Sequence, residues 1–241
     1  MSSLIKRGKA MKKLIIAEKP SLARNIADGI KLLGENPIKK EGYLESYSFI
    51  ITWCYGHLLE LINLEEYSED YDKTQKYPWT LVGLPFYPKE FKYELKKDKN
   101  KNVDQGIKKQ YLIIKSLVES AEVETIINAG DADREGEIII RNVLDKMHNT
   151  KKVYRLWMPD QTPQTIKYQL THLELDSKYD NMANEGLART FIDWIYGINL
   201  TRYATCKAKA FPPLKVGRVV TPIIKAIYER DKEIKNFKPE K

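Results

Sequence analysis

The sequence predicts an α/β domain with a mostly parallel sheet flanked by helices, followed by a mainly helical segment. Over about the first 170 residues, short apolar runs alternate with amphipathic helical patterns, an order typical of parallel βαβ units. From residue 178 onward the pattern is helical. Two of the apolar runs end directly in acidic residues, which would place carboxylates at one edge of the sheet.

The first elements follow from local composition. Residues 13–17, "KLIIA", predict a strand that ends at Glu18, and Pro20 then opens the helical pattern "SLARNIADGIKLL", where its missing N–H costs nothing. Residues 43–55 are β-branched and aromatic and predict two strands. Residues 63–102 combine tyrosine, proline, lysine and aspartate with weak periodicity, which predicts a long ordered loop.

The remaining elements alternate until the helical segment begins. The segment 103–122 predicts a helix whose apolar residues, at helical spacing, should lie on the sheet: Ile107, Tyr111, Ile114, Leu117 and Val118. The next predicted elements are the strand "VETIINAG", the helix "EGEIIIRNVLDKM", the strand "VYRLW" and the helix "TPQTIKYQL". Residues 178–208 and "RVVTPIIKAIYERDKEI" predict two further helices.

Composition narrows the class of protein. Lysine and arginine outnumber aspartate and glutamate by 41 to 33, and the net charge of +8 favours a polyanionic partner such as nucleic acid, although a solvated Lys-rich surface would give the same excess. The chain has only two cysteines, Cys54 and Cys206, and they are far apart, which argues against a disulfide scaffold or a zinc cluster and favours a reducing, cytoplasmic location. No apolar run is long enough for a membrane span or a signal peptide core, so we expect no membrane association.

The acids of "NAGDADREGE" form the main candidate site. Asp131, Asp133 and Glu135 stand on alternate positions after a predicted strand, and Glu18 follows another. Carboxylates this close repel one another unless a cation neutralises them, and Mg²⁺ prefers such oxygen ligands. The alternative is that the acids only cap the following helix, for which a single acid would suffice.

Two other motifs place acids at similar spacing. An EF-hand loop requires a glutamate at its twelfth position, which is Asn142 counted from Asp131, and the preceding segment predicts a strand where that motif has a helix. A haloacid dehalogenase site also places two aspartates after a strand, with the first as nucleophile, but usually has threonine or valine where Glu135 stands. We keep the second as a weaker alternative.

Five ordered blocks together resemble the Toprim region of type IA DNA topoisomerases, most closely the topoisomerase III branch: "IIAEKPSLARNIAD", "TWCYGHLLEL", "AGDADREGE", "LARTFIDWIYGINLTR" and "VGRVVTP". The resemblance implies a Rossmann-like Toprim domain over residues 12–172 and the first part of a helical DNA-binding domain over residues 173–241. Residues 1–11 would be an N-terminal extension, which we expect to be disordered.

The resemblance also implies roles for single residues. Glu18, Lys19 and Arg134 match catalytic positions: the glutamate manages the proton on the leaving 3′ oxygen, and the lysine stabilises charge on the phosphoryl group. Asp131, Asp133 and Glu135, with Glu18, match the acidic Mg²⁺ site.

Further matches concern positions that contact DNA and a histidine in the "GHL" block. Arg189, Arg218 and Thr221 match positions that contact single-stranded DNA. His57, in the "GHL" block, is expected to be a structural turn residue.

The chain departs from the family pattern in two ways. Val220 and Lys215 replace a common glutamine and serine. The nucleophilic tyrosine of a Tyr-Pro-Arg motif is missing, and we interpret Tyr77 in "KYPWT" as a structural aromatic residue.

The resemblance therefore implies an amino-terminal fragment, whether shortened deliberately, by gene truncation or as half of a split enzyme. The intact enzyme would be an ATP-independent isomerase that changes DNA topology, with the remaining topoisomerase domains as partners. This chain would bind Mg²⁺ and single-stranded DNA without cleaving alone. Two alternatives stay open: a stand-alone Toprim nuclease or primase-like protein, and a non-catalytic DNA-binding module.

Overall fold

The computed structural model describes residues 11–70 and 78–238, and these form two compact units. The first comprises Met1–Glu60 and Tyr93–Leu187, and the second comprises Leu61–Lys92 and Ala188–Lys241. Residues 1–10 of the expected N-terminal extension, and Tyr77, lie outside the described residues. The boundary expected between residues 172 and 173 stays a prediction.

A mixed sheet forms the centre of the first unit, with the strand order β2-β3-β4-β1-β7-β8-β9 in its described residues. The strands are β1 (Lys12–Ala17), β2 (Ile38–Lys40), β3 (Tyr43–Glu45), β4 (Phe49–Trp53), β7 (Val123–Ala129), β8 (Val153–Arg155) and β9 (Glu174–Leu175). The neighbours β4, β1, β7 and β8 run parallel, and antiparallel strands complete both edges. The predicted α/β fold with a mostly parallel sheet is therefore confirmed.

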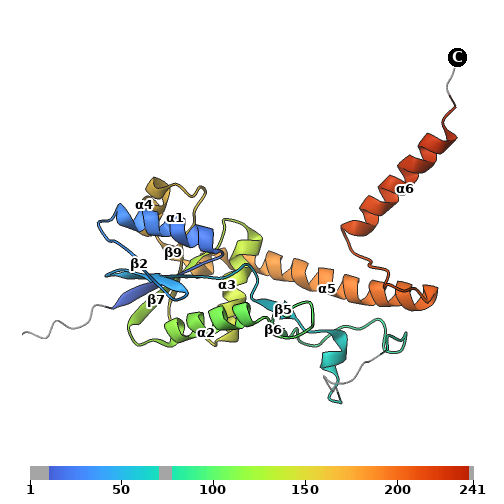
Figure 1. The fold of residues 1–241 in the computed structure, drawn as a ribbon, viewed down its shortest axis with the longest axis horizontal. Coiled ribbons are helices and arrows are strands. Elements are labelled where there is room, and N and C mark those ends of the chain that lie inside the picture. The colour runs from blue at the N-terminus through green and yellow to red at the C-terminus, as the bar shows by residue number, and fades with distance from the viewer. Residues whose placement is uncertain (1–10, 71–77, 239–241) are drawn as a thin grey trace, which may run out of the picture. The chain divides into compact units, whose positions relative to one another are not determined.

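Helices cover both faces of this sheet, which is why the central strands carry apolar side chains on both faces. Leu14 and Ile16 of β1 point to the face covered by α2 (Gln105–Glu119) and α3 (Arg134–Lys146). Ile15 and Ala17 point to the face covered by α1 (Pro20–Lys31) and α4 (Pro163–Leu170). Figure 1 shows α1 and α4 on one side of the sheet and α2 on the other.

The helices of the first unit begin and end close to the predicted positions. Pro20 opens α1 and Pro163 opens α4, as expected of proline in a first turn. On the predicted apolar face of α2, Ile114, Leu117 and Val118 are buried, and Ile107 and Tyr111 pack against the same core. That helix prediction is confirmed, including the face that meets the sheet.

The sequence did not predict the shortest strands. β2 and β9 lie at the sheet edges, and β5 (Leu59–Leu61) pairs with β6 (Tyr93–Leu95) in a separate two-stranded sheet. A strand of two or three residues carries no alternating pattern, and β3 and β8, which are equally short, could be predicted only because they lie in longer runs rich in β-branched and aromatic residues. The expected loop over residues 63–102 is therefore interrupted by β6 and by the 3₁₀ helix η1 (Leu64–Tyr67).

In the second unit, aromatic residues explain the unusual composition of that segment. The rings of Phe91 and Phe191 stack with centroids 3.9 Å apart, and Trp194 meets Phe91 edge-on at 5.8 Å. Phe191 and Trp194 belong to α5 (Asp180–Ala208), and α6 (Val220–Asn236) follows a proline-containing loop. Both helices agree with the predicted helical segment.

Candidate functional site

The carboxyl ends of the neighbouring strands β1 and β7 bring two predicted site segments together. Glu18 follows β1 and Asp131 follows β7, and the two strands pair in parallel. The backbone N–H of Asp131 donates a hydrogen bond to Oε2 of Glu18 at 3.1 Å. Nζ of Lys19 lies 2.5 Å from Oδ2 of Asp131. We call this group, with Asp133 and Glu135, the acid edge.

The other two acids of the acid edge have different partners. Asp133 is the N-cap of α3, and its Oδ1 accepts a hydrogen bond from the backbone N–H of Gly136 at 2.7 Å. Glu135, in the first turn of α3, places Oε2 3.3 Å from Nε2 of His57. Within the described ranges, the structure holds no group of three or more His, Cys, Asp or Glu side chains arranged as metal ligands.

Arg134 pairs with an acid outside the acid edge. Its guanidinium contacts Glu185 of α5, with NH1 2.5 Å from Oε1, inside the first unit. Gly186 lies directly against this turn, since a Cβ there would be 2.7 Å from the backbone oxygen of Arg134. The structure therefore brings Glu18, Lys19 and Asp131 together and directs Arg134 to α5.

Two glycines allow the acid loop to turn tightly. A Cβ on Gly130 would lie 2.0 Å from the backbone oxygen of Gly136, and a Cβ on Gly136 would lie 2.4 Å from that of Asp131. Any side chain at either position would force the backbone apart. The glycines of "AGDADREGE" therefore set the close return of the chain from β7 into α3.

The buried side chain of Arg155, which was not among the predicted site residues, binds the backbone of the same loop. The side chains of Arg155 and Glu137 are both fully buried, with Nε and Oε2 2.7 Å apart. Arg155 also donates to the backbone oxygens of Gly130 at 2.9 Å and of Asp131 at 2.8 Å. These hydrogen bonds from the guanidinium fix the backbone of the loop that carries Asp131.

Glu137 connects this arginine to a second layer of polar groups. Its Oε1 accepts from Nε of Arg141 at 2.9 Å, and Arg141 also contacts Asp176 at 2.8 Å. The buried amide of Asn128 donates to Oδ1 of Asp176 at 3.0 Å. Burial raises the pKa of the Asp176 carboxyl above its ordinary value, while the charge of Arg141 opposes that shift. One feature of the sequence could have indicated this buried network: Arg155 is a charged residue inside an otherwise apolar strand.

The acid edge has unusual protonation properties. Burial is the main reason that the pKa of Glu18 is raised, and the charges of Asp131 and Asp133 act in the same direction. The hydrogen bond to Asp131 raises the pKa of Lys19. The edge therefore combines a carboxyl group whose pKa is raised by burial with an ammonium group whose pKa is raised by its carboxylate partner.

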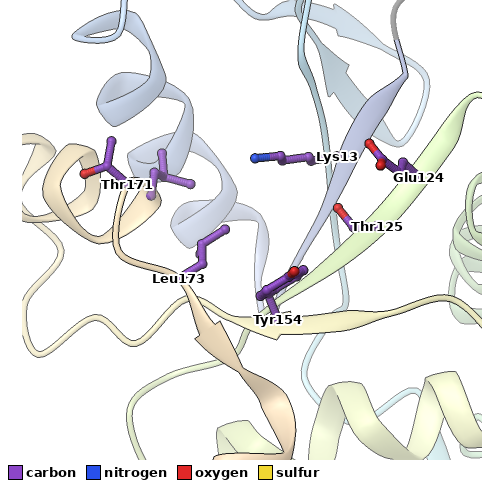
Figure 2. A pocket seen from close by; sticks show the side chains of 7 residues that line it. Lys13, Glu124, Thr125, Tyr154, Thr171 and Leu173 are labelled. Carbon is purple, nitrogen blue, oxygen red and sulfur yellow. The ribbon is translucent and has the colours of Figure 1, made fainter.

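A cavity of about 350 Å³ lies at the other end of the same strands (Figure 2). Its lining includes Lys13 and Thr125, which are paired in register near the start of β1 and β7, together with Tyr154 of β8. Ligands of open α/β sheets bind at the carboxyl ends of the strands. The cavity is therefore separate from the acid edge, which remains the candidate site.

Comparison with known families agrees with these observations. A Toprim domain model matches residues 13–160, and a DNA topoisomerase model matches residues 177–241. The first match covers more than half of the chain. The chain belongs to the Toprim family. The order of the two matches confirms the resemblance to type IA topoisomerases drawn from the sequence.

Individual relatives support this assignment. The chain is 40% identical over 231 residues to DNA topoisomerase 3 of Staphylococcus epidermidis, and 39% identical over 230 residues to that of Staphylococcus saprophyticus. These matches cover 96% and 95% of the chain, but the chain spans only 30% of the length of each relative. Topoisomerase I from Thermotoga maritima shares the fold, with a TM-score of 0.61 at 21% identity over 94% of this chain and 31% of that one.

The positions expected to contact DNA all lie in the second unit, in the part of the chain after the Toprim match. Arg218 forms a two-pronged contact with Asp193, at 2.6 Å from Nε and 3.1 Å from NH2, and Arg189 lies 3.8 Å from the same carboxylate. Oγ1 of Thr221 accepts from the backbone N–H of Gly217 at 3.1 Å. Val220, at the start of α6, is exposed.

In the part of the chain that the structure describes, we find no helix with the length and apolar character needed to cross a bilayer.

Replacing Arg155 by methionine should destabilise the Toprim unit strongly, because Glu137 would be left as a buried charge without its main partner. We expect the free energy of unfolding to fall by about 3–5 kcal/mol, measured by urea denaturation. The matched control is Lys31→Met, which removes an exposed pair with Asp28 and should change stability by less than about 1 kcal/mol. Equal effects of the two substitutions would show that Arg155 does not hold the loop.

Proposed function

We propose that this chain supplies the Toprim part and an adjoining DNA-binding segment of a type IA topoisomerase. The reaction would be a reversible transesterification: a tyrosine oxygen attacks a phosphodiester of single-stranded DNA, and the 3′ oxygen leaves. The reverse reaction rejoins the strand after another has passed, and the phosphotyrosyl ester conserves the bond energy without ATP. The tyrosine would come from outside these 241 residues, since the sequence has no Tyr-Pro-Arg motif.

The observation that carries this proposal is the contact between Glu18 and the backbone N–H of Asp131 at the carboxyl edge of the sheet. It joins the two acidic segments at the place where ligands of such sheets bind. Burial raises the pKa of Glu18, so this carboxylate takes up a proton more readily than an exposed one, which suits it to exchange a proton with the leaving 3′ oxygen. Lys19 is suited to stabilise negative charge on the phosphate.

Mg²⁺ fits the chemistry of the acid edge. All four acids offer hard oxygen donors, and Asp131 already binds a cation, the ammonium group of Lys19. Glu18, Asp131, Asp133 and Glu135 would hold the ion, and the present partners of the last two are the backbone N–H of Gly136 and the ring of His57. When bound, Mg²⁺ would supply positive charge that stabilises phosphate oxygens during rejoining.

One observation favours a second function, a DNA-binding module with structural acids. Asp133 already acts as a helix cap, as the capping alternative requires. A stand-alone nuclease or primase is less well supported, because the DNA topoisomerase model matches the segment after the Toprim domain. The cytoplasmic location expected from the cysteines stays a prediction.

Asp131→Asn should weaken Mg²⁺ binding at least about tenfold, because an amide is a poorer ligand for a hard cation. Isothermal titration of the chain with MgCl₂ measures this, and Glu124→Gln at the opposite end of β7 is the control. Asp133→Asn distinguishes a metal ligand from a helix cap at this position. Asparagine caps a helix as well as aspartate does, but it is a poorer ligand for Mg²⁺. Unchanged affinity in Asp133→Asn would restrict that residue to capping, and unchanged affinity in Asp131→Asn would remove the metal site.

Arg218→Gln should weaken binding to a single-stranded oligonucleotide and reduce the dependence of log K on log salt by about 0.7, the value for one lost phosphate contact. Asp193→Asn should have the opposite effect on affinity, because it releases Arg218 from its carboxylate partner. Fluorescence anisotropy across a salt series measures both. Arg230→Gln, in the exposed part of α6, is the control and should preserve the slope within error. Equal slopes in all variants would place the DNA contact elsewhere.

A further inference from the structure

Gln161 contacts the acid edge from a third loop. It lies between β8 and α4, and its Nε2 donates a hydrogen bond to Oδ1 of Asp131 at 3.2 Å. Neither the sequence motifs nor the family resemblance pointed to this residue. With Lys19 on Oδ2, both oxygens of the Asp131 carboxylate therefore have a partner.

The two partners of Asp131 differ in charge. A divalent cation at Oδ2 would repel the ammonium group of Lys19, which must then move away. The amide of Gln161 is neutral and can stay on Oδ1. Gln161 is therefore the partner that can keep the plane of the carboxylate fixed in both situations.

Other contacts fix the orientation of Gln161 itself. Nδ2 of Asn25, on α1, donates to Oε1 of Gln161 at 3.0 Å, so the opposite end of the amide, the NH₂ group, faces Asp131. The preceding residue, Asp160, anchors the loop by accepting hydrogen bonds from the hydroxyls of Thr162 at 2.7 Å and Thr165 at 2.9 Å. A chain of hydrogen bonds thus runs from α1 through Gln161 to Asp131.

We propose that Gln161 is a positioning residue for the metal ligand Asp131, and that Asn25 acts through it. Gln161 holds Oδ1 so that Oδ2 faces the site when Lys19 withdraws. Partners of this kind, behind the groups that bind a metal, typically change metal affinity by about 10–100-fold. This inference rests on the proposed function, since it requires Asp131 to bind the ion.

The test uses Mn²⁺ as the probe and the electron paramagnetic resonance signal of the free ion as the readout. Gln161→Met keeps the length of the side chain and removes the donor, and we expect Mn²⁺ affinity to fall about tenfold. Gln164→Met, an equally exposed glutamine of α4, is the matched control and should bind like the parent. Because Gln161 is exposed, neither substitution should change the free energy of unfolding measurably.

A second variant, Asn25→Ala, tests whether Asn25 acts through Gln161. Alone it should weaken Mn²⁺ binding by a few fold, and in the Gln161→Met background it should have no further effect, because Asn25 acts only through Gln161. Parent-like affinity in Gln161→Met, with weakened binding in Asp131→Asn, would overturn the positioning role and leave the metal site standing. Parent-like affinity in Asp131→Asn would overturn both.

Discussion

The buried pair of Arg155 and Glu137 is the interaction on which the acid edge depends. Removing two charges from water costs several kcal/mol for each ion, and the pair repays this only if the remaining polar atoms are also satisfied. Here Arg155 uses its other N–H groups on the backbone oxygens of Gly130 and Asp131. The requirement to satisfy the arginine therefore fixes the backbone of the acid loop, and the close approach of Gly130 and Gly136 leaves that backbone little freedom.

The side chains above this fixed backbone are arranged differently. Each carboxylate of the acid edge has its own partner: Glu18 has the backbone N–H of Asp131, Asp131 has Lys19, Asp133 has the start of α3, and Glu135 has His57. Lys19, His57 and Glu135 are all substantially exposed, so water can replace their contacts at small cost. The site thus combines a backbone held in place with two acids, Asp131 and Glu135, whose present side-chain partners can be exchanged for a cation.

Periodicity was enough to predict the central strands and the covering helices, because those elements bury one or two apolar faces over at least two turns or several strand residues. It failed for β5 and β6, which are three residues long and exist only because they pair with each other. The positions of Glu18 and Asp131 could be inferred because parallel neighbours end at the same edge. The direction of Arg134 could not, since its partner Glu185 lies on a helix far along the chain.

The residues that the sequence analysis missed share one physical property. Arg155 and Gln161 act through partners that are 24 to 30 positions away along the chain, at Asp131. No local pattern records such a distance, and an arginine in a strand or a glutamine before a helix has an ordinary surface interpretation. What distinguishes them is the atom that each contacts: Arg155 holds the backbone of Asp131, and Gln161 holds one oxygen of its side chain. One buried and one exposed residue thus act on the same acid: Arg155 fixes the position of its backbone, and Gln161 fixes the direction in which the Oδ2 oxygen, now bound by Lys19, points.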